Sequence, residues 1–76
     1  MKYVLFTRDK PPVFYKHILE MFTTSYEIRP VCKESLLGLH HHGSLRLIFD
    51  EKYVTDEILD LANACCTGMD QEVVVL

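Results

Sequence analysis

The order of strand and helix signals along the chain is the feature that most constrains its fold. Four short runs are rich in β-branched, aromatic and other apolar residues, which is typical of strands. Between the first and second runs, and again between the third and fourth, apolar residues recur at helical spacing. The strand-like runs are residues 2–8, 27–34, 44–50 and 71–76, and the helical segments are residues 12–25 and a segment that begins near Thr55. The sequence therefore predicts the element order β-α-β-β-α-β.

Capping residues support both predicted helices. Asp9 precedes Pro11 and Pro12, which is typical of a helix start, because an acidic cap accepts a free N–H and proline lacks one. Thr55 is the expected N-cap of the second helix, and the two acidic residues that follow it suit the positive end of the helix dipole. Gly68 is the expected C-terminal stop of that helix.

The apolar pattern of each strand predicts its place in a sheet. Residues 2–8 are apolar on both alternating faces, which favours a central strand. Residues 44–50 alternate between apolar and polar positions, so this strand is expected to bury one face. Pro30 cannot donate a hydrogen bond within a sheet, and the strand over residues 27–34 is therefore expected at an edge.

Two split β-α-β units of this kind pack naturally as a ferredoxin-like sandwich. We predict an α+β fold of two layers, in which a four-stranded antiparallel sheet carries two helices on one face. Right-handed crossovers then give the strand order 4-1-3-2, with the first and third strands in the centre. A chain of 76 residues has room for one domain, so residues 1–76 are predicted to form a single domain.

Residues 3–22, YVLFTRDKPPVFYKHILEMF, resemble the start of a glutaredoxin. The shared features are an opening strand, a threonine beside a basic residue, a short loop, and a helix that carries Tyr15 and Lys16. The resemblance implies a β-α-β start. The Cys-Pro-Tyr-Cys motif of that family is missing, because the stretch from Lys10 to Phe14 contains no cysteine, and thiol–disulfide exchange at this loop is excluded.

Composition places the chain among small globular proteins. Hydrophobic residues make up 49% of the chain and its net charge is −3, which is too apolar and too weakly charged for intrinsic disorder. No apolar run approaches the ~20 residues that span a bilayer, and the apolar run at the N-terminus is too short for a signal peptide. The cysteines are 3 in number and irregularly spaced, which favours reduced thiols. We therefore expect a cytoplasmic protein with no membrane partner.

No motif in the sequence predicts catalysis. The glycine patterns of nucleotide-binding loops and the GxSxG elbow of hydrolases are absent. Cys65 and Cys66 fall late in an apolar helix, where the negative end of the dipole raises a thiol pKa and disfavours a nucleophile. The carboxylates from Asp50 to Asp60 fit a polar turn and an exposed helix face. We therefore expect a protein that is not an enzyme and needs no cofactor.

The most conspicuous cluster consists of His40, His41 and His42, between Gly38 and Gly43. Imidazole is a good ligand for zinc, copper and nickel. Consecutive side chains diverge, however, and no CxxC or HxxxH pair lies at a useful spacing, so an exposed polar loop between two strands is the preferred interpretation. A metal site formed by the three histidines, or a pH-sensitive contact, remains an alternative.

A second candidate site lies where the first strand ends. Thr7, Arg8 and Lys10 precede the predicted helix 12–25, and the N-terminus of a helix attracts anions through its free N–H groups and its dipole. The two basic residues would add positive charge to such a site. The simpler interpretation is a strand-to-helix turn that Asp9 caps.

In a ferredoxin-like sandwich the helices cover one face of the sheet and leave the other open. Alternation places a mixture of basic and apolar side chains on that open face, and exposed apolar patches usually mark partner surfaces. We expect a protein partner or a second copy to bind this face and the edge strands, through Val4, Phe6, Arg8, Arg46, Ile48 and Val74. Two alternatives are single-stranded nucleic acid on the same face, and a metal or anion held by the histidines or by residues 7–10.

Overall fold

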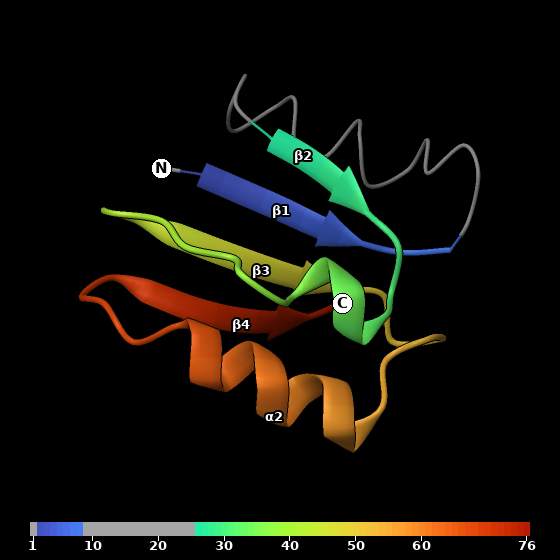
Figure 1. The fold of residues 1–76 in the computed structure, drawn as a ribbon. Coiled ribbons are helices and arrows are strands. Elements are labelled where there is room, and N and C mark those ends of the chain that lie inside the picture. Colours follow the sequence, from blue (N-terminus) through green and yellow to red (C-terminus); the bar gives the residue numbers. More distant parts are fainter. Residues whose placement is uncertain (1, 9–25) are drawn as a thin grey trace.

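The computed structural model describes residues 2–8 and 26–76, which form one sheet, one helix and one short 3-10 turn (Figure 1). The strands are β1 (Lys2–Phe6), β2 (Tyr26–Arg29), β3 (Leu45–Phe49) and β4 (Gln71–Val75). The α-helix is α2 (Asp56–Cys65), and the 3-10 turn is η1 (Lys33–Ser35). The helix predicted over residues 12–25 lies outside the described residues.

All four strands run in the same direction, in the order β2-β1-β3-β4. In the register of the sheet, Phe6 of β1 lies beside Arg29 of β2 and Phe49 of β3, and Phe49 lies beside Val75 of β4. The predicted ferredoxin-like fold is therefore wrong, because its sheet is antiparallel and has the order 4-1-3-2. The described residues thus form a four-stranded, all-parallel sheet with one helix.

The length of the connection between β2 and β3 explains the error. The second strand ends at Arg29, just before Pro30, although the sequence pattern predicted that it continues to residue 34. Residues 30–44 are therefore free to cross the sheet and return to its amino-terminal edge, which is what a parallel neighbour requires. Figure 1 shows this yellow-green segment running back from η1 to the start of β3.

The predicted division into central and edge strands is confirmed, although the two edge strands are exchanged and the strand directions differ. β1 and β3 are central, and β2, which ends before Pro30, is an edge strand. Val4, Leu5 and Phe6 are all fully buried, as expected for a central strand covered on both faces.

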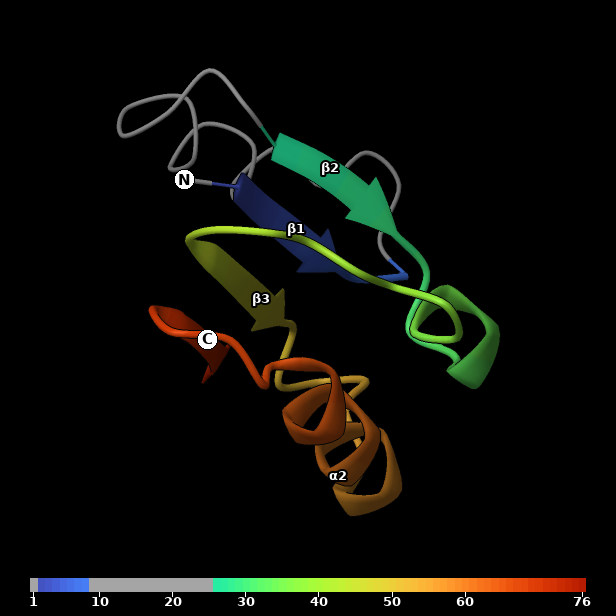
Figure 2. The ribbon, with the colours of Figure 1, turned by 60° about the vertical axis from the view of Figure 1, so that its left-hand side comes forward.

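One face of the sheet packs against α2 and against residues 30–44, and we call it the helix-side face. Figure 2 shows both of these segments on the same side of the strands. The aromatic rings of Phe6 and Phe49 stack at the centre of this face, 4.5 Å apart and 7° from parallel. Ile58 and Ala62 of α2 complete the core on one side of the stack. The residues of the sheet that point to this face are Val4, Phe6, Leu45, Leu47, Phe49 and Val73.

The predicted start of the second helix is confirmed at Thr55. The Thr55 hydroxyl accepts a hydrogen bond of 3.3 Å from the backbone N–H of Ile58, so it satisfies one of the free donors of the first turn. Asp56 and Glu57 follow at the positive end of the helix. Within residues 2–8 and 26–76, no helix has the length and apolar character needed to cross a membrane.

Candidate functional site

The carboxyl ends of the strands meet at one edge of the sheet, because all four strands are parallel. Thr7 and Arg8 follow β1 at this edge, and Asp50 follows β3. From β1 the chain proceeds to β2 on one side, and from β2 it crosses to β3 on the other side (Figure 1). The strand order therefore reverses between β1 and β3. Ligands of open parallel sheets bind outside the carboxyl ends of the strands at such a reversal.

Thr7 and Asp50 join the two strands at this point. The Thr7 hydroxyl donates a hydrogen bond of 3.0 Å to Oδ2 of Asp50, and both residues are buried, with 4% and 1% of their surface exposed. The other carboxylate oxygen of Asp50 accepts a bond of 3.1 Å from the backbone N–H of Lys52. A buried carboxylate is stable only when such donors replace water, so these two bonds hold Asp50 in place.

Arg8 links the same edge to the chain beyond β2. Its guanidinium Nη2 donates a hydrogen bond of 3.1 Å to the backbone carbonyl of Val31, while the residue as a whole is exposed. Among residues 2–8 and 26–76, no carboxylate forms an ion pair with Arg8. The positive charge of Arg8 is therefore not neutralised by this part of the chain.

The structure describes two of the three residues of the predicted anion site. Thr7 and Arg8 lie next to each other at the carboxyl edge, whereas Lys10 lies outside the described residues. The Thr7 hydroxyl proton is directed to Asp50, so Thr7 braces the edge instead of donating to a ligand. A guanidinium carries five N–H donors in a planar fork and suits phosphate or carboxylate groups, so Arg8 is the residue equipped to hold an anion here.

Sequence reasoning missed the part that Asp50 plays at this edge. Its carboxylate was assigned to a solvated turn, but the structure buries it almost completely between β1 and the turn after β3. Asp50 directly follows the most regular strand of the chain. A polar residue directly after a regular strand indicates a position at the carboxyl edge, where ligands bind, only when the sheet is parallel.

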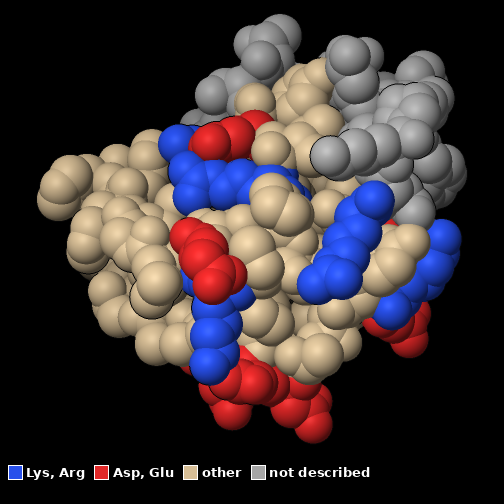
Figure 3. Space-filling model, turned by 45° about the vertical axis from the view of Figure 1, so that its right-hand side comes forward, with Lys and Arg blue, Asp and Glu red and all other residues tan. Residues whose placement is uncertain are grey.

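Charges alternate over the surface around this edge. Figure 3 turns the carboxyl ends of the strands toward the viewer and shows Lys and Arg side chains in separate groups, several of them beside Asp or Glu. Lys33 and Glu57 form an ion pair in which the charged atoms lie 2.6 Å apart, and the hydrogen bond with Glu57 raises the pKa of Lys33. A strand of nucleic acid would need a continuous basic track for its phosphates, and the described residues visible in Figure 3 do not form one.

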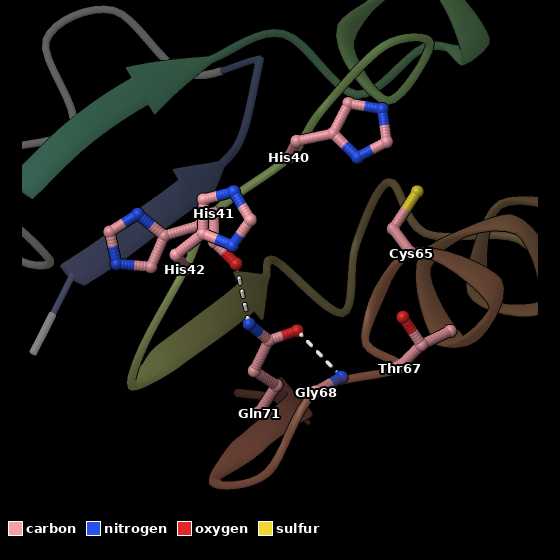
Figure 4. A pocket seen from close by; sticks show the side chains of 7 residues that line it. All are labelled: His40, His41, His42, Cys65, Thr67, Gly68 and Gln71. Carbon is pink, nitrogen blue, oxygen red and sulfur yellow. Dashed lines mark hydrogen bonds between the residues drawn. The ribbon is translucent and has the colours of Figure 1, made fainter.

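A second polar cluster lies at the amino-terminal edge of the sheet, in a pocket of about 240 Å³ (Figure 4). The side chain of Gln71 links the segments that line the pocket. Its Nε2 donates hydrogen bonds to the carbonyls of His41 and Gly43, at 2.8 and 3.0 Å. Its Oε1 accepts a hydrogen bond from the N–H of Gly68, at 3.2 Å. The lining residues are His40, His41, His42, Cys65, Thr67, Gly68 and Gln71. Sequence reasoning did not connect Cys65 or Gln71 with the histidines.

The three histidines do not form a metal centre with the described residues. Figure 4 shows the rings of His40, His41 and His42 pointing in different directions. Within residues 2–8 and 26–76, no three His, Cys, Asp or Glu side chains are grouped so that they could hold a metal ion. The thiol of Cys65 is directed instead to the carbonyl of Leu36, at 3.6 Å.

The residues expected to form an open interaction face do not share one surface. Val4 and Phe6 belong to the helix-side face and are fully buried, so they cannot touch a partner of the folded protein. Ile48 and Val74 lie on the opposite face, where Ile48 is also buried. Arg8 stands at the carboxyl edge. The expectation is corrected because α2 and residues 30–44 cover the face of the sheet that the antiparallel prediction left open (Figure 2).

Arg46, the sixth residue of that expected face, is engaged within its own chain. Its Nη2 lies 2.7 Å from Oδ1 of Asp70, and its Nε lies 2.8 Å from Oε1 of Glu72. The hydrogen bond with Asp70 raises the pKa of Arg46. In turn, hydrogen bonds from Ser44 and then from Arg46 lower the pKa of Asp70 below its usual value.

No protein-family model, curated protein or solved structure matches this chain. The two polar clusters differ in their position in the sheet. The histidine pocket lies at the amino-terminal edge of the sheet, whereas Thr7, Arg8 and Asp50 lie at the carboxyl edge, beside the two central strands. The carboxyl edge is the position that parallel sheets use for ligands.

Proposed function

We propose that this chain is a small ligand-binding domain that holds an anionic group at the carboxyl ends of β1 and β3. One observation carries the proposal: the strand order reverses between these two strands, where the Thr7–Asp50 hydrogen bond joins them. In open parallel sheets, ligands bind in the crevice outside the strand ends at such a reversal. The proposal takes up the anion-binding alternative predicted for residues 7–10, of which Thr7 and Arg8 are described.

The charges at this edge favour an anion over a metal cation. Asp50 is only 1% exposed and its two carboxylate oxygens accept hydrogen bonds from Thr7 and Lys52, so its charge braces the strand ends and is not presented to a ligand at the surface. Arg8 is exposed, and its hydrogen bond to the carbonyl of Val31 holds the guanidinium at the edge. Within residues 2–8 and 26–76 no other bond of this guanidinium is seen, so the other N–H groups of its fork can serve a ligand. Phosphate and carboxylate groups match that fork.

Titration with inorganic phosphate tests the proposal, with citrate as a second probe that carries carboxylates. We expect either anion to raise the melting temperature of the protein in a saturable manner, because a ligand that binds only the folded state stabilises it. The variant Arg8→Ala should weaken binding by tenfold or more, since a charge-assisted hydrogen bond contributes about 1.5–3 kcal/mol.

Lys2→Ala is the matched control, because Lys2 is also a cation of β1 but lies at the opposite, amino-terminal end of the strand. It should leave the affinity for phosphate unchanged. If neither anion stabilises the wild-type protein, or if Arg8→Ala binds as tightly as Lys2→Ala, the carboxyl edge is not an anion site.

A further inference from the structure

The second feature with functional meaning is the outer edge of β4. β4 is the last strand of the sheet, and within the described residues it pairs with β3 alone. The carbonyl of Asp70 accepts from the N–H of Leu45 at 3.1 Å, and Leu76 donates to Phe49 at 3.0 Å and accepts from Glu51 at 2.9 Å. Even-numbered residues therefore bond to β3.

The odd-numbered residues of β4 turn their backbone groups the other way. In a parallel pair of strands, alternate residues of one strand form the hydrogen bonds to a given neighbour. Because Asp70 and Leu76 point to β3, the N–H and C=O groups of Gln71, Val73 and Val75 point outward from the sheet. No strand among residues 2–8 and 26–76 meets this outward row.

The side chains along this edge are apolar. Val73, Val74, Val75 and Leu76 follow one another without interruption, and Val75 and Leu76 are 42% and 48% exposed. Sheet edges are normally protected from other strands by lysine, proline, a bulge or a free charge. Residues 70–76 contain neither lysine nor proline.

The two carboxylates near the start of β4 do not protect the edge either. Arg46 of β3 pairs with both Asp70 and Glu72, at 2.7 and 2.8 Å, so its one positive charge offsets one of the two negative charges. Two antiparallel copies of β4 place these carboxylates at opposite ends of the strand pair, so the like charges do not face each other.

We propose that the outer edge of β4 pairs, in antiparallel orientation, with the same edge of a second copy of this chain. A two-fold axis at Val74 places Val73 of each copy opposite Val75 of the other, and the outward backbone groups of both residues then exchange hydrogen bonds. The result is one continuous sheet through both copies. The pairing closes after two chains, because each edge is used once.

A second copy fits this edge because the strand is complementary to itself. With the axis at Val74, every position from 73 to 75 faces another valine, and β-branched pairs across strands stabilise a sheet. One short strand pair buries less surface than the roughly 1,200–2,000 Å² of a stable specific interface. We therefore expect a dimer that dissociates on dilution.

Sedimentation velocity over a range of protein concentrations tests the pairing, with Val75→Pro and Val75→Thr as matched variants. Proline removes the outward N–H of residue 75 and leaves the even-numbered bonds to β3 in place. Threonine keeps both the N–H and the branched shape. We expect the wild type and Val75→Thr to form dimers and Val75→Pro to remain a monomer. A monomeric wild type, or a dimeric Val75→Pro, overturns the proposal.

Hydrogen exchange on the wild type gives a second test that does not depend on the folding of a variant. At high concentration the N–H groups of Val73 and Val75 should be protected, and on dilution they should lose that protection. The N–H groups of Val74 and Leu76, which face β3, should stay protected throughout. Exchange at Val73 and Val75 that does not change with concentration overturns the proposal.

Discussion

Thr7 and Asp50 are separated by 43 positions in the sequence, yet the hydroxyl of one donates a 3.0 Å hydrogen bond to the carboxylate of the other. The parallel register that sets Phe6 beside Phe49 brings the two residues together, since each directly follows one of these strand ends. The bond fixes the carboxyl ends of the two central strands relative to each other. Any ligand bound beside Arg8 would lie next to these fixed strand ends.

We expect Thr7→Val to destabilise the protein by about 1–3 kcal/mol, because it removes the hydroxyl that donates a hydrogen bond to the buried carboxylate of Asp50. Thr7→Ser, which keeps the hydroxyl, should cost less. Urea denaturation of the two variants measures the difference. Combining Thr7→Val with Asp50→Asn should cost less than the sum of the two single changes, and strict additivity would contradict the coupling.

Asp70 should make the folded state sensitive to acid. Hydrogen bonds from Ser44 and Arg46 lower its pKa in the folded protein below the usual 3.8, so the ionised carboxylate stabilises the fold at pH values above 3.8. That contribution should be lost as the pH falls below 3.8 and through the lowered pKa. Asp70→Asn should therefore be less stable than the wild type at neutral pH and should approach it in strong acid.

Asparagine is chosen so that the substitution changes the charge of residue 70 without straining the backbone. Asp70 has a φ of +60°, in the left-handed region that asparagine tolerates well. Melting temperatures measured between pH 2 and pH 7 give the result. A stability difference between the wild type and Asp70→Asn that stays constant over this range would show that the Asp70 charge has no role in the fold.

Thr55→Ala should destabilise the protein by about 0.5–2 kcal/mol, because it removes the side-chain acceptor for the N–H of Ile58 at the start of α2. Thr55→Ser is the matched control and should retain most of the stability. Chemical denaturation measures both variants. Equal stability of Thr55→Ala and Thr55→Ser would mean that the cap does not stabilise α2.

Phe6→Ala should destabilise the protein by about 3–5 kcal/mol, because Phe6 is fully buried and stacks on Phe49. The more conservative Phe6→Leu should cost less. Neither variant should change the oligomeric state of the molecules that remain folded, since Phe6 lies beneath α2. Thermal denaturation measures the loss of stability, and sedimentation measures any change of oligomeric state. A loss of association without a loss of stability would mean that Phe6 contacts a partner after all.

The sequence predicted the strands, their central or edge positions and the cap of α2, because each of these depends on local patterns. Thr55 is recognisable from the two acidic residues after it, and Pro30 marks the end of an edge strand. Strand direction was not predictable in this way, because alternation of side chains is identical in parallel and antiparallel strands. The direction depended on whether residues 30–44 formed a turn or a crossover.

The candidate site was predictable in part for the same reason. Arg8 was identified from its place at the end of the first strand, which is a local feature. Asp50 lies beside Thr7 and Arg8 only because β1 pairs with β3 in parallel. Cys65 and Gln71 line the histidine pocket only because of the way α2 and β4 pack. Contacts between distant segments require the topology, and here the predicted topology was wrong.

The central claim is that an anion binds at the carboxyl edge beside Arg8. Titration of the ¹⁵N-labelled protein with inorganic phosphate, followed by two-dimensional NMR, tests it most directly. We expect saturable shift changes at the backbone amides of Thr7, Arg8, Glu51 and Lys52, and none at Ser44 or Gln71 at the opposite ends of the strands. Shift changes confined to His40–Gly43 and Gln71, or none at all, would contradict the claim.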